Sequence, residues 1–288
     1  MLGTAQFGLP YGIANRRGKP DIGQVREILE YAHHLGIRSL DTAAAYGESE
    51  AVLGVCGMDR WSVITKVPSF QGVEDAKLGS KAREAVLRSL DLLKVEALNA
   101  VLAHDHRDMI GDRGRRLRDA LEPLLEAERV DKIGISAYAP ENVESIEPAN
   151  AQVVQAPLNV LDQRFVASGA AARLSAAGGE LHVRSAFLQG LLLMQATERP
   201  ARFAAWAREL SLFDEHVHAS GLDPAAFCLG YVAGQADVQR CVVGVETIQQ
   251  LSHLVTAFEA GQLASFNTQD LRSDDLGLID PRQWGDAT

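Results

Sequence analysis

The sequence is poor in cysteine, and its cysteines do not have the spacing of a metal site. Cys56, Cys228 and Cys241 occur singly along the chain. We therefore expect small buried hydrophobic residues in a protein from a reducing compartment, and we expect no metal site.

Long apolar runs are absent, and basic side chains are outnumbered. No segment of the 288 residues is apolar over a bilayer's thickness, and residues 1–4 lack the charged and apolar regions of a signal peptide. The chain has 28 Lys and Arg against 38 Asp and Glu, a formal net charge of −10. This balance argues against a nucleic-acid or membrane partner, but it is compatible with a local basic pocket for a phosphate. We expect a cytoplasmic protein that acts on a small molecule.

Common nucleotide-binding and hydrolytic motifs are missing as well. The sequence contains no P-loop, no Gly-x-Ser-x-Gly elbow and no His-Glu-x-x-His motif. No Gly-x-Gly-x-x-Gly turn follows the first apolar segment, which argues against an open, doubly wound dinucleotide-binding sheet.

Short apolar strands alternate with helical stretches along the chain, of which 47% is hydrophobic. Strands are predicted at 1–6, 37–41, 61–67, 97–104, 132–136, 151–155, 180–184 and 240–244. Helices are predicted at 22–35, 49–55, 79–93, 117–127, 141–146, 166–177, 201–219, 224–234 and 248–261. Eight such units predict an α/β fold, a parallel (β/α)8 or TIM barrel, in one domain over 1–288. Residues 262–288 show no clear period and are predicted to be a C-terminal loop or tail.

Asp41 ends an apolar strand, and Tyr46 follows it in the loop before the next helix. A charged residue at that place suits a site at the carboxyl edge of a parallel sheet. The alternative is structural: Asp41 caps the helix start and Tyr46 is a surface ring.

Further polar residues end the neighbouring strands, namely Lys66, His104, Ser136 and Gln155. A buried Lys66 needs a counter-charge, and Asp41 on the next strand is the natural partner. A cation beside a phenol should lower the pKa of Tyr46 and make it a proton donor near neutral pH. Alternatively, Lys66 is an edge residue that reaches solvent, and His104 is a core or surface histidine.

Several of these residues lie in segments that resemble the aldo-keto reductases. The segments are Leu40-Asp41-Thr42-Ala43-x-x-Tyr46-Gly47-x-Ser49-Glu50-x-x-Leu53-Gly54, Thr65-Lys66, the His104 strand, Gly134-Ile135-Ser136, Gln155-x-x-x-Asn159-x-x-x-x-Arg164, Phe187-Leu188-Gln189-Gly190-Leu191 and Val243-Gly244. They cover nearly the whole chain in the order found in that family.

The resemblance implies a (β/α)8 barrel that binds NADP(H) without a Rossmann motif and reduces aldehydes or ketones. It makes Tyr46 the acid, has Asp41 and Lys66 tune it, and has His104 orient the substrate. The cofactor-binding positions it implies are Gly3, Thr4, Asp41, Ser136, Gln155, Arg184, Ser185, Phe187, Gln189, Gly190, Gly244, Val245, Glu246, Thr247 and Gln250.

The chain departs from the family's pattern at both ends of the expected cofactor site. Ala137 replaces an Asn that holds the carboxamide, and Arg184 replaces a stacking Tyr or Trp, where it binds cofactor or an acidic substrate.

At the adenosine end, Gly244, Val245 and Gln250 replace the Lys, Ser and Arg that clamp a 2′-phosphate. His253 and Leu254 stand at the adenine positions. We therefore expect a weakened preference for NADP(H), with NAD(H) tolerated or cofactor binding poor. The backbone amides of 244–247 remain available for a phosphate.

The substrate is less well specified. The first loop, with Phe7, and the tail, with Phe266 and Trp284, are candidates for the barrel mouth together with loop arginines such as Arg107 and Arg113; the alternative is that these charged loops are only solvated. Such a mouth would suit a small polar or sugar-like carbonyl compound. Two other functions stay open: a regulatory barrel with weak cofactor binding, and an isomerase that uses Lys66 or His104 as its base.

Overall fold

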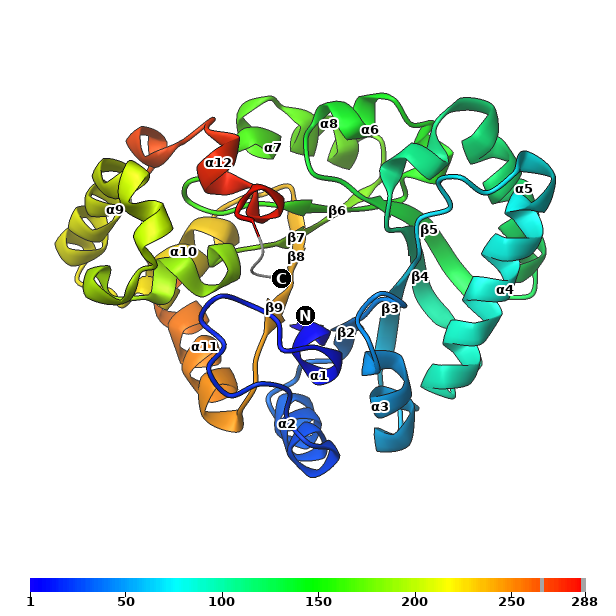
Figure 1. The fold of residues 1–288 in the computed structure, drawn as a ribbon, viewed down its shortest axis with the longest axis horizontal. Coiled ribbons are helices and arrows are strands. Elements are labelled where there is room, and N and C mark those ends of the chain that lie inside the picture. The colour runs from blue at the N-terminus through cyan, green and yellow to red at the C-terminus, as the bar shows by residue number, and fades with distance from the viewer. Residues whose placement is uncertain (265–266, 286–288) are drawn as a thin grey trace.

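The computed structural model describes residues 1–264 and 267–285, and its parallel strands surround a central axis (Figure 1). The strands are β1 (Leu2–Gly3), β2 (Ser39–Asp41), β3 (Ser62–Val67), β4 (Leu98–Ala103), β5 (Val130–Ser136), β6 (Val153–Pro157), β7 (Glu180–Arg184), β8 (Val238–Cys241) and β9 (Val243–Gly244). Their order in the sheet is β8-β7-β6-β5-β4-β3-β2-β1-β9. Each of β1 to β7 therefore lies beside its neighbour in sequence, as in a (β/α)8 barrel.

The predicted eighth strand is divided at Val242, and this division raises the strand count to nine. Strand β8 pairs with β7, whereas β9 pairs with β1. The backbone N–H of Val242 still donates to Val183 O at 2.7 Å, and that of Val243 donates to Met1 O at 3.1 Å. The two short strands are thus one segment that changes partner, and this change closes the barrel.

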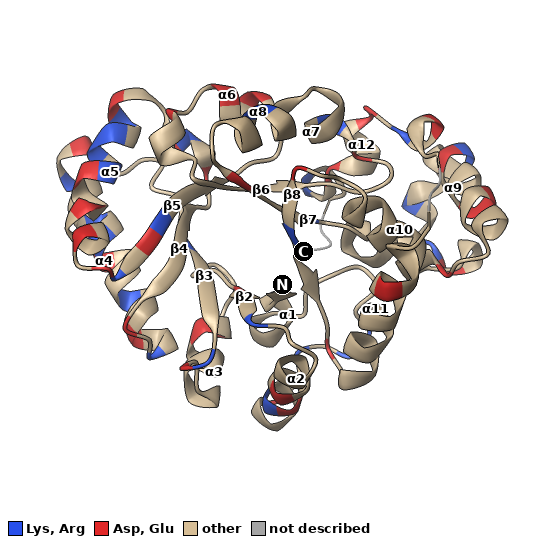
Figure 2. Ribbon diagram, turned by 180° about the vertical axis from the view of Figure 1, so that it is seen from behind, with Lys and Arg blue, Asp and Glu red and all other residues tan. Residues whose placement is uncertain are grey.

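Helices occupy the outside of the barrel. The longer ones are α2 (Ile22–His34), α3 (Ser49–Cys56), α4 (Asp75–Leu93), α5 (Gly111–Glu126), α9 (Ala207–Ser220), α10 (Pro224–Ala233) and α11 (Ile248–Gly261). The shorter ones are α1 (Ala5–Gly8), α6 (Glu141–Glu144), α7 (Arg164–Ala167), α8 (Ala170–Ala176) and α12 (Leu276–Ile279). Figure 2 shows that Lys, Arg, Asp and Glu lie mostly on these outer helices.

Helix α2 illustrates how the sequence sets an element. Asp21 accepts a hydrogen bond from Gln24 N, and Gln24 Oε1 accepts one from Asp21 N, which closes a capping box at the first turn. Val25, Ile28 and Leu29 form the buried face. The helix ends at His34, just before Gly36, which has a φ of 82°.

Some element bounds differ from those predicted. Helices α4 and α5 begin at Asp75 and Gly111, four and six residues earlier than the predicted starts at 79 and 117, because their first turns are polar. The helix predicted at 166–177 is two helices, α7 and α8, separated at Gly169, which has a φ of 74°.

The described part of the C-terminal region contains short helical segments where a loop or tail was predicted. They are η6 (Gln269–Leu271), α12 and η7 (Pro281–Gln283). Within residues 1–264 and 267–285, no helix has the length and apolar character needed to cross a membrane.

Gly54, the last residue of the segment from Leu40 to Gly54, lies where α3 meets α4. A Cβ there would lie 2.0 Å from Leu92 O. We predict that Gly54→Ala lowers the free energy of unfolding by about 1–3 kcal/mol, because the two helices must move apart. Urea unfolding measures this change. Gly234→Ala is the control, since its Cβ would meet nothing closer than 3.5 Å; equal unfolding midpoints for the two variants would contradict the packing argument.

Candidate active site

A buried ion pair joins the carboxyl ends of β2 and β3. Lys66 Nζ lies 2.7 Å and 2.8 Å from the two carboxylate oxygens of Asp41, and it also donates to Thr42 O at 3.1 Å. The side chains of Lys66 and Asp41 are 1% and 3% exposed. Lys66 therefore does not reach solvent, and Asp41 does not cap a helix. Burial lowers the pKa of Lys66, and Asp41 opposes that shift.

Tyr46 and His104 lie beside this pair. Lys66 Nζ is 5.0 Å from the centroid of the Tyr46 ring. The rings of Tyr46 and His104 meet edge to face, with centroids 6.2 Å apart. The structure thus brings together the four residues selected from the sequence, although they come from three strand ends and one loop.

The loop that carries Tyr46 is held by contacts to the first strand and helix. Thr4 Oγ1 donates to Asp41 O at 2.9 Å, and Ser49 Oγ donates to Thr4 O at 2.9 Å. A Cβ at Gly8 would lie 1.8 Å from Tyr46 O, so only glycine permits this approach. The Tyr46 backbone is therefore fixed from the N-terminal side.

The pKa of Tyr46 shifts in the direction opposite to the sequence-based prediction. Burial, and next the negative charge of Asp41, raise this pKa well above its usual value. Lys66 is paired with Asp41 at 2.7 Å, so its charge does not overcome the effect of burial on the resting phenol. Tyr46 consequently keeps its proton at neutral pH.

His104 is neutral at the same pH. Burial, followed by the positive charges of Lys66 and Arg184, lowers its pKa to about 4. A neutral imidazole has one N–H donor and one acceptor, so His104 can donate a hydrogen bond to a carbonyl oxygen. The two rings together form a neutral, hydrogen-bonding end of the site.

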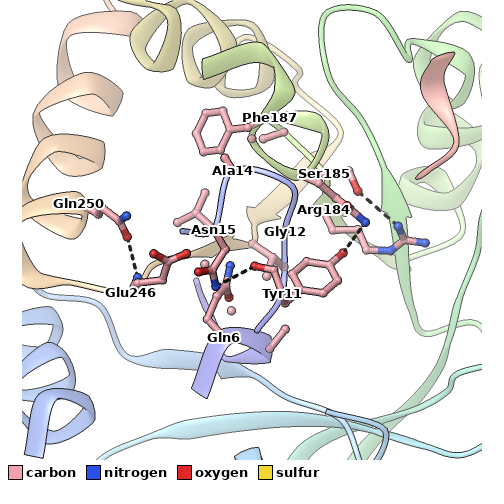
Figure 3. Close-up of a pocket in the computed structure, with 18 of the residues that line it drawn as sticks. Gln6, Tyr11, Gly12, Ala14, Asn15, Arg184, Ser185, Phe187, Glu246 and Gln250 are labelled. Carbon is pink, nitrogen blue, oxygen red and sulfur yellow. Dashed lines mark hydrogen bonds between the residues drawn. The ribbon is translucent and has the colours of Figure 1, made fainter. Parts of the chain in front are cut away.

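A cavity of about 260 Å³ opens beside Tyr46 and Asp41 and extends toward α11. Most of the predicted cofactor positions line it: Gly3, Thr4, Asp41, Gln155, Arg184, Ser185, Phe187, Gln189, Gly190, Gly244, Glu246 and Gln250. Figure 3 shows five of them around the cavity, namely Arg184, Ser185, Phe187, Glu246 and Gln250.

Three predicted cofactor positions, Ser136, Val245 and Thr247, do not line this cavity. Ser136 is buried beside Gln155 in the sheet register, and Val245 is a core residue at 1% exposure. Thr247 is the N-cap of α11, where its Oγ1 accepts a hydrogen bond from Gln250 N. Lys66 and His104 are not among the lining residues either, but both lie against Tyr46, which is one of them.

The loop after β1 forms a wall of the cavity that the sequence did not assign to cofactor binding. It contributes Gln6, Tyr11, Gly12, Ala14 and Asn15. Gly12 has a φ of 101° and lies near Gln189 O, so this loop reaches the segment after β7. The Gly-containing irregular stretch between β1 and α2 was the available signal, but nothing in its residue types indicated which side of the barrel it would cover.

Gln155 carries an unused acceptor in the buried part of the site. Its Nε2 donates to Asp41 Oδ1 at 2.7 Å, whereas its Oε1 is buried without a hydrogen-bond partner among the described residues. A buried acceptor without a donor costs about 1–3 kcal/mol, so this oxygen suits a ligand that brings an N–H group.

Arg184 lies next to Ala137, where the expected asparagine is missing. Its Nη2 donates to Ala137 O at 3.1 Å, and its Nη1 lies 3.4 Å from Ser185 Oγ. The guanidinium also stacks on the Tyr138 ring, 4.3 Å from the centroid, and Arg282 lies 3.6 Å from the same centroid. Arg184 thus brings hydrogen-bond donors to the place where the Ala137 side chain has none.

The predicted mouth residues are not arranged as expected. Phe7 is fully buried in the core, and Trp284 is buried against Phe203 with ring centroids 4.8 Å apart. Phe266 lies outside the described residues.

The two loop arginines have intramolecular partners as well. Arg107 pairs with Asp105, and Arg113 pairs with Asp75 and Asp108. The placement of Phe7 and Trp284 at the barrel mouth is therefore wrong, and each of the two arginines has an acidic partner.

Comparison with known proteins agrees with the barrel fold described above. Residues 1–273 match the model of the aldo/keto reductase family. No curated protein matches the chain. The putative aldo-keto reductase PA4992 from Pseudomonas aeruginosa is 20% identical, covering 91% of this chain and 89% of that one, with a TM-score of 0.67. The aldo-keto reductase AKR11C1 from Bacillus halodurans, in its holo form, is 20% identical with a TM-score of 0.69, covering 98% of this chain and 94% of that one. At these identities the likeness shows that this chain has the same fold as the two structures.

Removing one member of the buried ion pair should destabilise the fold. We predict that Lys66→Met lowers the free energy of unfolding by about 3–5 kcal/mol, because Asp41 would remain buried without its counter-ion. The double variant Asp41→Asn/Lys66→Met should recover at least about 1 kcal/mol of this loss. Urea unfolding of wild type, both single variants and the double variant measures the coupling; strictly additive losses would contradict it.

The neutral state of His104 can be measured directly. Its pKa is about 4 in the folded protein and about 6.5 when unfolded. The stability that its neutral form contributes is therefore fully present above about pH 6.5 and is lost as pH falls through about 4. An NMR titration should find His104 neutral at about pH 5.5, where an ordinary histidine is protonated.

A matched stability experiment uses His104→Gln beside the exposed His34→Gln. Between about pH 7 and pH 4.5, His104→Gln should lose less stability than wild type does. His34→Gln should follow wild type, and the same behaviour in both variants would contradict the assignment.

Proposed function

The chain belongs to the aldo/keto reductase family, and from that premise we propose that it reduces an aldehyde or ketone to an alcohol with NADP(H) or NAD(H). The observation that carries the proposal is the convergence of Tyr46, His104 and the Asp41–Lys66 pair at one end of a cavity. The substrate is a small carbonyl compound.

The residues around the cavity fit a nicotinamide cofactor. Gln155 Oε1 is a buried acceptor that has no donor within 1–264 and 267–285, and a carboxamide NH₂ group would satisfy it. Arg184 offers N–H donors beside Ala137 and would hold the carboxamide oxygen in place of the missing asparagine. When bound, the nicotinamide supplies the hydride for carbonyl reduction.

The chain's own residues would polarise the carbonyl and supply the proton. Tyr46 remains a neutral O–H donor because its pKa is raised, and it gives its proton to the carbonyl oxygen as negative charge develops there. His104 is neutral, so it can donate a second hydrogen bond to the same oxygen. Lys66, held by Asp41, places a positive charge 5.0 Å from the Tyr46 ring and stabilises the phenolate left after transfer. This charge acts on the developing anion rather than on the resting phenol.

Tyr46→Phe tests the proton donor. We predict a fall of about 10²–10⁴ in kcat/KM for a reactive aldehyde, because the general acid is lost. The dissociation constants of NADPH and NADH should change little, since the phenyl ring remains. Steady-state assays of cofactor absorbance measure kcat/KM, and quenching of intrinsic fluorescence measures the dissociation constants.

Tyr31→Phe, on α2, is the matched control, since it removes a phenol from a residue that does not line the cavity. It should retain wild-type turnover. Turnover by Tyr46→Phe at the wild-type rate would reject Tyr46 as the acid. If the wild-type protein bound neither dinucleotide, this result would reject the proposed reductase function and favour a barrel without this activity.

A further inference from the structure

Glu246 places a carboxylate in the part of the cavity that adjoins α11. It lies between β9 and α11, after Val245 and directly before Thr247, the N-cap of α11. The side chain is half-buried and lines the cavity. Figure 3 shows Glu246 and Gln250 on one side of the cavity and Arg184 on another. The cavity therefore has a basic residue at one place and an acidic residue at a separate one.

Basic side chains are scarce around Glu246. Arg184 is the one Lys or Arg that lines the cavity in the described part of the chain. Burial raises the pKa of Glu246, and the charge of exposed Arg17 opposes this shift. The ring of His253 lies 3.4 Å from the carboxylate of Asp223, so it has an acidic partner of its own. A phosphate group at this end of the cavity would meet the Glu246 carboxylate, and among the described residues no Lys or Arg lines the cavity beside it.

Side chains already accept hydrogen bonds from two backbone amides at the start of α11. Gln250 Oε1 accepts a hydrogen bond from Glu246 N at 2.6 Å. Thr247 Oγ1 accepts one from Gln250 N at 3.1 Å. Of the amides of 244–247 that the sequence left available for an anion, that of Glu246 is therefore already satisfied.

We propose that Glu246 makes the cavity selective for NAD(H) over NADP(H). Its carboxylate accepts hydrogen bonds from the free hydroxyls of the adenosine ribose and repels the 2′-phosphate of NADP(H). This inference rests on the proposed function, since it requires a dinucleotide whose adenosine end lies at α11. It goes further by assigning the choice of cofactor to one side chain.

Equilibrium binding tests the proposal without any carbonyl substrate. Dissociation constants for NADH and NADPH are measured by fluorescence titration at about pH 8, where a glutamate is ionised. Competition by 5′-AMP and by adenosine 2′,5′-bisphosphate tests the adenosine end alone. The proteins compared are wild type, Glu246→Gln and Glu259→Gln. Glu259 is an exposed acid on the same helix, so its variant makes the same change in net charge outside the cavity.

Wild type should bind NADH at least about tenfold more tightly than NADPH, a preference that corresponds to about 1.4 kcal/mol. Glu246→Gln should reduce this ratio about tenfold, mainly through tighter NADPH binding, and Glu259→Gln should leave it unchanged. The wild-type preference should also weaken as salt is added, because Glu246 is partly exposed to solvent.

Two groups of results would overturn the inference. A wild-type preference for NADPH, or a ratio that is the same in Glu246→Gln and wild type, rejects Glu246 as the determinant and leaves the reductase proposal intact. Binding of neither dinucleotide rejects the reductase proposal together with this inference. The two failures are therefore distinguished by whether wild type binds any dinucleotide.

Discussion

The contact between Lys66 and Asp41 is the constraint on which the rest of the site depends. Both charges are almost fully buried, so each requires the other. Their pairing fixes the ends of two neighbouring strands, and the bond from Gln155 ties the same carboxylate to β6 across the barrel. One carboxylate therefore fixes the positions of groups from three strands.

The same contact explains the protonation states around it. Because Asp41 neutralises Lys66, burial dominates the resting Tyr46, and its phenol stays protonated. For His104, burial and the positive charges of Lys66 and Arg184 outweigh the opposing effect of Asp41 and Asp105, and the imidazole stays neutral. A site with one compensated ion pair and two neutral donors suits the stabilisation of negative charge on an oxygen as that charge forms.

Much of the fold follows from local sequence patterns. The bounds of β7 match the prediction, and α2 begins as predicted because its capping box and apolar face are both local signals. Periodicity gave later starts for α4 and α5, because polar first turns carry no hydrophobic repeat. The division of the last strand at Val242 was also missed, since it arises when one segment pairs with β7 and then with β1.

For the candidate site, the sequence by itself determined which side chains stand at the strand ends, because strand periodicity and motif order locate Asp41, Lys66, His104 and Gln155. It did not determine their ionisation, which depends on burial and on charges from distant segments. Only the tertiary structure decided that Phe7 and Trp284 are buried rather than exposed at the mouth. It also decided that the loop after β1 lines the cavity, because a loop's place depends on packing between elements far apart in the chain.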